Sequence, residues 1–177
     1  MRVITGSAKG TTLLSLDALT VPLSDRAKSA LFAIIQNKIS GANVLDIYAG
    51  SGALGIECLS RGADFVQFFD IAKKSIASIE KNLEKTHFTA KAEVVRANVE
   101  KQLDKYIYEQ FDIIFVCPPY DTIKFHVVQQ AVEYLKPFGI LIFEHDKRNI
   151  YTLLDGVKKI DDRKYGIINF EIYQKTI

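Results

Sequence analysis

This chain of 177 residues contains few cysteines and few prolines, and its positive and negative charges are nearly balanced. The two cysteines, Cys58 and Cys117, are too few for a disulfide framework or a cysteine-rich zinc site. No apolar run approaches the roughly 20 residues needed to span a bilayer. The opening sequence MRVITGSAKG lacks the basic-then-apolar layout of a secretion signal. We therefore expect a cytoplasmic protein with no membrane partner.

The composition is that of one folded domain. Hydrophobic residues make up 48% of the chain and the net charge is only +2, which excludes a disordered polymer. No linker, repeat or low-complexity tract divides the sequence, so we expect a single domain over 1–177 with 1–40 as an N-terminal extension. That extension carries a net charge of +3 and the remainder −1. The excess suits a phosphate backbone, but scattered solvated charge explains it equally well.

The apolar pattern predicts a doubly wound α/β fold. A short hairpin is expected over 2–14, and a helix capped by Ser24 is expected to run to about Lys38. Apolar runs and amphipathic stretches then alternate, which is typical of parallel strands covered by helices on both faces. The expected strands are 43–48, 65–69, 92–96, 111–116 and 139–144, and the expected helices are 53–61, 72–86, 99–108 and 123–135.

The chain is expected to end differently, in an antiparallel hairpin. The runs 157–163 and 167–174 follow one another around Tyr165 and Gly166, with no room for a crossover helix. The sequence therefore predicts a seven-stranded mixed sheet of Rossmann-like type, with a small N-terminal hairpin and helix as an extension.

A glycine-rich turn follows the first predicted strand of the sheet. The segment Val44–Glu57 contains Gly50-Ser-Gly-Ala-Leu-Gly55, placed between a buried strand and a helix. Glycines at such a turn let a ligand lie against the backbone, and the helix offers free N–H groups. Asp46 is expected near the carboxyl edge of the sheet, where open α/β sheets bind ligands. A purely structural turn is the alternative.

Asp70 ends the next predicted strand. An acidic residue at this place in nucleoside-binding sheets accepts hydrogen bonds from ribose hydroxyls. A strand-end Asp also caps helices, and a helix is predicted to follow from Ala72. We favour the ribose role because the glycine turn accompanies it, and the capping role stays open.

A third motif, Cys117-Pro-Pro-Tyr120, ends the fourth predicted strand. The two prolines fix the backbone and remove two N–H donors, which leaves a stiff corner with carbonyl acceptors. An aromatic ring beside such a corner can stack on a base, a contact of about 1–3 kcal/mol. Acceptors together with a stacking ring would hold an exocyclic amine and aim its lone pair. A plain strand-terminating turn is the alternative.

The three motifs together resemble those of class I S-adenosylmethionine-dependent methyltransferases. Val44–Glu57 resembles their first motif, Asp70 their acidic ribose residue, and Cys117–Tyr120 their (Asp/Asn/Ser)-Pro-Pro-(Tyr/Phe) motif. Other segments resemble the bacterial 16S rRNA (guanine-N2)-methyltransferase family across nearly the whole chain. These segments are Met1–Gly6, Lys9-Gly10, Ser24–Lys28, Leu31-Phe32, Ser60–Ala63, Asn82-Leu83, Phe143–Lys147 and Lys164–Tyr173.

The resemblance implies methylation of a guanine amino group in small-subunit rRNA, with S-adenosylmethionine as the methyl donor. The implied partner is ribosomal RNA, in the small subunit or an assembly intermediate, and we expect a monomer. It implies a catalytic role for Cys117, Pro118, Pro119 and Tyr120. It also implies RNA contacts by Arg2, Lys9, Arg26 and Lys28. The implied cofactor-binding residues are Asp46, Tyr48, Ala49, Gly50, Ser51, Gly52, Gly55, Asp70, Ile71 and Asn98.

Cys117 departs from the family pattern, which has Asp or Asn at this position. A thiol is a weak acceptor for an amine N–H, although the Pro118 carbonyl remains. The alternative function is therefore a catalytically weakened ribosome-assembly factor that binds cofactor and RNA. A nucleophilic role for Cys117, as in some pyrimidine C5 methyltransferases, is a remoter option. In the extension, Val21 and Ser29 stand where the family tends to carry Arg and Glu.

No metal site is expected. His87 and His126 have no companion at metal-ligand spacing. His145 lies between Glu144 and Asp146, but a strand-end cluster hydrogen-bonded to its neighbours explains this better than a set of ligands.

Overall fold

The computed structural model describes residues 1–16, 24–105, 110–119, 124–149, 151 and 154–176. Seven strands form one sheet in the order β3-β2-β1-β4-β5-β7-β6. The strands are β1 Asn43–Ile47, β2 Phe65–Asp70, β3 Ala92–Arg96, β4 Phe111–Val116, β5 Leu135–Asp146, β6 Val157–Tyr165 and β7 Ile168–Lys175. The predicted seven-stranded mixed sheet is confirmed.

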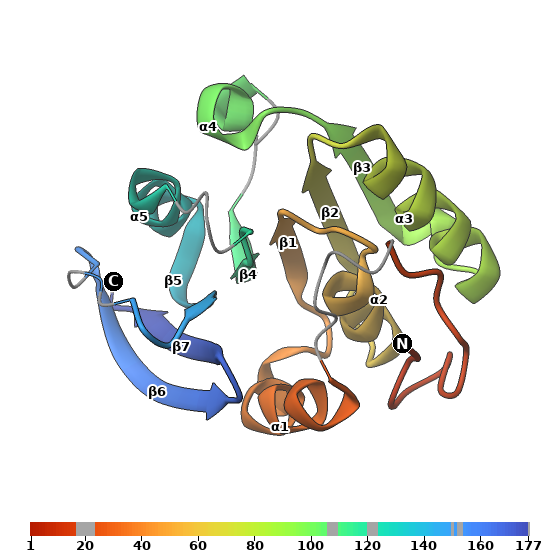
Figure 1. The fold of residues 1–177 in the computed structure, drawn as a ribbon, viewed down its shortest axis with the longest axis horizontal. Helices are drawn as coiled ribbons and strands as arrows, with labels where there is room; N and C mark the ends of the chain where they lie inside the picture. The colour runs from red at the N-terminus through yellow and green to blue at the C-terminus, as the bar shows by residue number, and fades with distance from the viewer. Residues whose placement is uncertain (17–23, 106–109, 120–123, 150, 152–153, 177) are drawn as a thin grey trace.

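Helices cover both faces of the sheet (Figure 1). The α-helices are α1 Asp25–Ile35, α2 Ala53–Ser60, α3 Lys73–Thr86, α4 Val99–Gln102 and α5 Phe125–Glu133, with 3-10 turns at Gln36–Lys38, Thr89–Lys91 and Leu103–Lys105. The Ser24 hydroxyl caps α1 by accepting a hydrogen bond from the Ala27 amide at 3.2 Å. The helix expected over 99–108 is only one turn of α-helix and one 3-10 turn, with 106–109 outside the described residues.

The strand register fixes which loops are neighbours. β1 pairs in parallel with β2 on one side and with β4 on the other, so that Ile47 is level with Phe69 and with Val116. β5 continues the parallel array beside β4. β7 then runs antiparallel between β5 and β6, as the terminal hairpin requires. The loops after β1, β2, β4 and β5 therefore all leave the sheet at its carboxyl edge.

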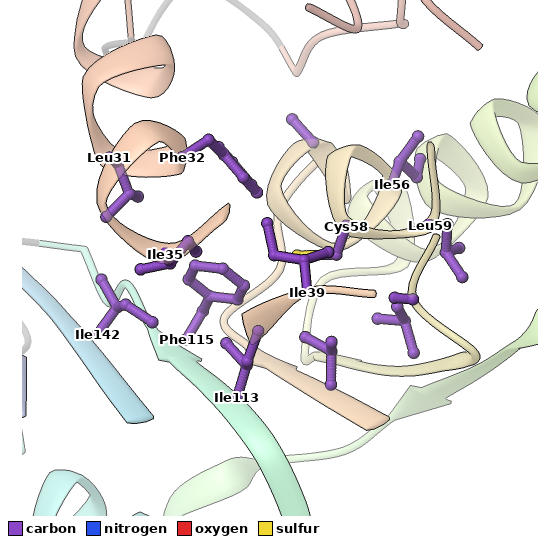
Figure 2. Close-up of a cluster of buried hydrophobic side chains, with 14 of the residues drawn as sticks. Leu31, Phe32, Ile35, Ile39, Ile56, Cys58, Leu59, Ile113, Phe115 and Ile142 are labelled. Atoms are coloured by element: carbon purple, nitrogen blue, oxygen red, sulfur yellow. The ribbon is translucent and has the colours of Figure 1, made fainter. Parts of the chain in front are cut away.

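Two apolar cores lie on the two faces of the sheet. One packs α1, α2 and α3 onto side chains such as Ile113, Phe115 and Ile142, as Figure 2 shows for part of this cluster. The other packs α4 and α5 onto the alternate side chains of the same strands, such as Ile114 and Phe143. This alternation accounts for the uninterrupted apolar strands of the sequence. None of the described helices is long and apolar enough to cross a bilayer.

The N-terminal arm is docked against α2. Its expected hairpin is reduced to one antiparallel bridge between Arg2 and Thr12. The fully buried Glu57 carboxylate accepts hydrogen bonds from the amides of Ile4 at 2.8 Å and Thr5 at 3.0 Å. The same carboxylate pairs with the Lys28 ammonium at 3.1 Å and with Arg61 at 2.8 Å. Glu57 therefore joins the arm, α1 and α2 at one point.

The predicted RNA contact by Lys28 is wrong. Its side chain is completely buried, and its ammonium also donates to the Arg2 carbonyl at 2.6 Å. An ammonium held between a carboxylate and a carbonyl inside the protein has no access to a phosphate. Lys28 is a structural residue that ties α1 to the arm and to α2.

Glu57→Gln should destabilise the protein by roughly 3 kcal/mol, because it leaves the Lys28 charge buried without its counter-charge. The free energy of unfolding in urea measures this loss. Glu84→Gln, which makes the same chemical change at an exposed position on α3, is the control and should lie within about 0.5 kcal/mol of wild type. Equal losses in the two variants would contradict the structural role of Glu57.

Candidate functional site

The turn after β1 is held in left-handed backbone conformations. Tyr48, Gly50 and Gly52 have φ angles of 62°, 59° and 76°. This conformation is ordinary for glycine but uncommon for tyrosine. Such outliers persist where the surrounding structure holds them, often at ligand sites. The turn ends at Gly52, which is the N-terminal cap of α2, so the first amides of that helix face the turn.

Gly55 is required by packing between α2 and the sheet. A Cβ at this position would lie 2.3 Å from a ring carbon of Phe68 and 2.8 Å from a methyl carbon of Val66. Both neighbours belong to the buried strand β2, so they cannot give way cheaply. Gly55 therefore brings the start of α2 close to the sheet, as the third glycine of dinucleotide-binding turns does.

Asp46 supports the turn from beneath. Its side chain is 1% exposed, and its carboxylate accepts a hydrogen bond from the Gly55 amide at 3.1 Å. Burial raises the pKa of Asp46 to about 7, with a further rise from the charge of Asp70 and a partial offset from the Gly55 N–H. The Asp46 carboxylate therefore becomes protonated as the pH falls through neutrality. It lies near the carboxyl edge of the sheet.

Asp70 holds two backbone segments together. One carboxylate oxygen accepts from the Gly50 amide at 2.9 Å and the other from the Ala72 amide at 2.8 Å. Asp70 is not the cap of α3, because the N-cap of that helix is Ala72, which has no side-chain capping hydrogen bond. The pairing with Gly50 and Ala72 instead ties the loop after β1 to the loop after β2. It does not exhaust the carboxylate, since each oxygen has a second lone pair for a hydroxyl donor. Asp70 is half-buried, beside the exposed side chain of Ile71.

Asn98 lies at the end of the neighbouring strand. The amide of the preceding residue, Ala97, donates to the Asp70 carbonyl at 3.1 Å. The Asn98 side-chain oxygen caps α4 by accepting from the Glu100 amide at 3.0 Å. The strand-end positions of Asp70 and Asn98 are therefore neighbours, as the resemblance requires.

The hydroxyl of Tyr48 is buried and has no hydrogen-bond partner among the residues that the structure describes. Burial raises the pKa of Tyr48 to about 12, and the charge of Glu100 adds to the rise. A buried polar atom without a partner is costly unless something outside the chain satisfies it. This orphaned hydroxyl, beside a glycine turn open to close backbone approach, fits a polar nucleoside-type ligand such as S-adenosylmethionine.

The double-proline corner leaves the sheet beside the glycine turn. The Cys117 amide donates to the Ile47 carbonyl at 3.4 Å, so the ends of β4 and β1 are directly joined. Cys117 is half-buried, Pro118 is buried and Pro119 is exposed. Tyr120 lies outside the described residues, as does Val21, and the stacking role of Tyr120 stays a prediction.

The Cys117 thiol interacts with Glu144 at the end of β5. Burial raises the pKa of Cys117 well above its usual value, and the nearby charges of Glu144 and Asp46 add to the rise. The thiol therefore stays protonated at neutral pH. A nucleophilic cysteine needs a lowered pKa, so this environment disfavours the remoter option of nucleophilic attack by Cys117.

Asn82 is a site residue to which the sequence assigned no role. It is fully buried on α3. Its amide group donates to the carbonyls of Ser51 at 2.9 Å and Leu14 at 3.0 Å, and its oxygen accepts from the Leu14 amide at 2.8 Å. It thus fixes the glycine turn to the arm. Its spacing from Ile79 and Leu83 places it on the buried face of the helix, which is the signal available in the sequence.

The predicted RNA contacts divide between the surface and the interior. Arg2 and Lys9 are exposed, with Arg2 paired to Asp25 at 3.1 Å. Arg26 lines a groove of about 610 Å³ between the start of α1 and the turn from β6 to β7. The other residues lining this groove are Ser24, Ala27, Lys164, Tyr165, Gly166, Ile167 and Ile168. Among the residues that the structure describes, the groove wall contains cationic and aromatic side chains and no acidic one.

The free energy of unfolding should depend on pH because of the raised pKa of Asp46. Between its ordinary pKa of 3.8 and about 7, the folded protein keeps a proton that the unfolded chain has released. Stability should therefore fall as pH rises through this window, by roughly 1.4 kcal/mol per pH unit relative to Asp46→Asn. Urea unfolding of both proteins across the window measures the difference. Parallel curves would show that the pKa of Asp46 is not raised.

Comparison with known proteins identifies the fold and the family. A family model described as Conserved hypothetical protein 95 matches residues 1–174. YlbH of Bacillus subtilis is 34% identical to this chain and covers 99% of both proteins. Ribosomal RNA small subunit methyltransferase D of Buchnera aphidicola is 33% identical over 99% of this chain and 86% of its own length.

A solved structure agrees with these relatives. That of the yhhF protein from Escherichia coli has a TM-score of 0.86 at 26% identity, and the match covers 99% of this chain and 98% of that one. The chain belongs to the family described as Conserved hypothetical protein 95, and it is a class I S-adenosylmethionine-dependent methyltransferase related to 16S rRNA methyltransferases.

Proposed function

We propose that this protein transfers a methyl group from S-adenosylmethionine to the exocyclic N2 amine of a guanine in small-subunit rRNA. The observation that carries the proposal is the direct junction of β1 and β4, which puts the glycine turn and the Cys117-Pro-Pro corner at one edge of the sheet. The related Buchnera protein is named for ribosomal RNA of the small subunit. The enzyme would act as a monomer in the cytoplasm, on the subunit or an assembly intermediate.

The donor would bind along the carboxyl ends of β1, β2 and β3. We assign the methionine part to Asp46 and the glycine turn, the ribose to Asp70, and the adenine to Asn98 and the exposed apolar face of Ile71. The orphaned Tyr48 hydroxyl gives this cradle an unsatisfied polar group. The remaining assigned residues are Ala49, Gly50, Ser51, Gly52 and Gly55.

The protein's part in the reaction is alignment. The bound donor supplies a strongly electrophilic methyl group, so no strong base is required. The double-proline corner offers the Pro118 carbonyl as a fixed acceptor, because the proline rings lock the backbone angle φ on both sides of that carbonyl. An acceptor that holds one amine proton turns the nitrogen lone pair out of the ring's conjugation. Placement of that lone pair against the methyl carbon then supplies most of the rate.

The groove beside α1 gives the RNA a place to bind. It opens at the carboxyl edge of the sheet, since Asp146 at the end of β5 is level with Ile168 in the groove wall. Arg26 and Lys164 supply positive charge for phosphates, and the Tyr165 ring supplies a surface on which a base can stack. A strand lying there would continue past Glu144 towards Cys117. We assign Arg26 to this groove and keep Arg2 and Lys9 as outer contacts.

Purified protein with labelled S-adenosylmethionine should transfer label to small-subunit RNA or subunits that lack the modification. Mass analysis of the digested RNA should find the label in N2-methylguanosine at one position. Tyr120→Ala should lower the rate at least roughly tenfold, because it removes the proposed stacking surface. Tight RNA binding with no transfer would favour the assembly-factor alternative, and label in a different nucleoside would contradict the assignment to guanine.

Arg26→Glu/Lys164→Glu should weaken RNA binding roughly 10- to 100-fold and lower the salt dependence of binding by about two counter-ions. Filter binding or fluorescence anisotropy over a range of salt concentrations measures both effects, while the affinity for S-adenosylmethionine should stay unchanged. Lys38→Glu is the matched control, because Lys38 is an exposed basic residue of the same extension near the opposite end of α1. If the control loses as much affinity as the double variant, the groove is not the RNA site.

A further inference from the structure

The residue that replaces the family's Asp has a carboxylate neighbour on the adjacent strand. The β4–β5 register pairs Phe115 with Ile142 and Val116 with Phe143, so the next position in each strand brings Cys117 level with Glu144. These two residues are not close in sequence. Only the strand register brings them together.

The two side chains also share a face of the sheet. Phe115 and Ile142 both point into the core beneath α1 and α2 (Figure 2). Side chains alternate along a strand, so Cys117 and Glu144, each two residues further on, point to that same side. Cys117 packs at the margin of this core. The influence of the nearby Glu144 charge on the Cys117 thiol, whose pKa it raises, agrees with this arrangement.

Glu144 is placed to reach a substrate, whereas Asp46, a second carboxylate on this face, is closed off from solvent. Asp46 is 1% exposed, and it is already bound to the Gly55 amide. Glu144 is half-buried at the edge of the sheet, and its backbone pairs with Phe170 of β7. A side chain on a strand enclosed by two others is held more rigidly than one on a loop. It also lies between the Cys117 corner and the cationic groove.

We propose that Glu144 is the catalytic acceptor that replaces the family's Asp at position 117. The inference rests on the proposed function and names a residue that acts in it. The Glu144 carboxylate would accept one amine N–H of the guanine while the Pro118 carbonyl accepts the other. The Cys117 thiol, as a donor, holds the carboxylate in place from the side. A charged acceptor binds an amine N–H more strongly than a thiol does.

The step balances without a further reactant. The guanine nitrogen uses its lone pair to form the N–C bond as the S–C bond of the donor breaks. The proton lost from nitrogen passes to the Glu144 carboxylate and then to water. S-adenosylhomocysteine and N2-methylguanine are the products.

Glu144→Ala should lower kcat for RNA methylation roughly 100-fold or more, by analogy with the removal of one fixed hydrogen-bonding group from an active site. The affinities for S-adenosylmethionine and RNA should stay within about twofold of wild type. Glu144→Gln keeps the shape of the side chain without its charge, and it should also lose most of the rate. Thermal unfolding of both variants shows whether a loss of rate comes from misfolding. Glu133→Ala, a change at an exposed glutamate on α5, is the control and should leave kcat unchanged.

The decisive variant is Cys117→Asp/Glu144→Ala, which returns the carboxylate to position 117. Its kcat should be at least about tenfold higher than that of Glu144→Ala. If Glu144 had only a structural role, the double variant would show no such rescue. Wild-type rates in Glu144→Ala, or the absence of rescue, would overturn the role of Glu144 while leaving the proposed function intact. A wild-type protein that transfers no label would overturn the proposed function itself.

Discussion

The parallel pairing of β1 between β2 and β4 is the constraint on which the rest of the site depends. Asp46, level with Phe68 on one side and Phe115 on the other, points beneath α2 because of that register. A slip of one residue in any strand turns its side chains to the opposite face. A slipped β4 would carry Cys117 away from Glu144 and out of line with the glycine turn. Buried side chains on both faces make such a slip costly, so apolar burial sets the geometry of the polar site.

Buried polar groups then fix the arm to this framework. Glu57 accepts from two arm amides and pairs with Lys28 and Arg61, and Asn82 links Leu14 to Ser51. A buried carboxylate is stable only when it is fully paired, because desolvation is expensive. The desolvation cost of burying Glu57 is offset only while the arm, α1 and α2 keep their relative positions. These contacts hold α1, and with it the groove at Arg26, in a fixed relation to the turn proposed to bind the donor.

The sequence was informative where one physical factor dominated. β4 has the predicted bounds Phe111–Val116, because an apolar run of this length between helices is stable only as a strand buried on both faces of the sheet. Lys28 was misjudged because charge was counted without the helical period, although its spacing from Leu31, Phe32 and Ile35 is that of a buried face. The Cys117–Glu144 neighbourhood was beyond reach, since strand register rather than sequence spacing creates it. The helix expected over 99–108 is shorter in the structure, because the polar residues around α4 give no apolar pattern that marks where the helix ends.

The same register explains why a thiol is tolerable at position 117. An aspartate there would stand beside Glu144 and near Asp46 on one face of the sheet, in a partly buried site. Two like charges about 4 Å apart repel by roughly 4 kcal/mol at the effective dielectric of such sites, so one carboxylate would stay protonated and cease to accept. A protonated thiol adds no charge and donates to its neighbour. Cysteine at 117 therefore avoids a second charge beside Glu144, and the proposed acceptor role of Glu144 needs no change of fold.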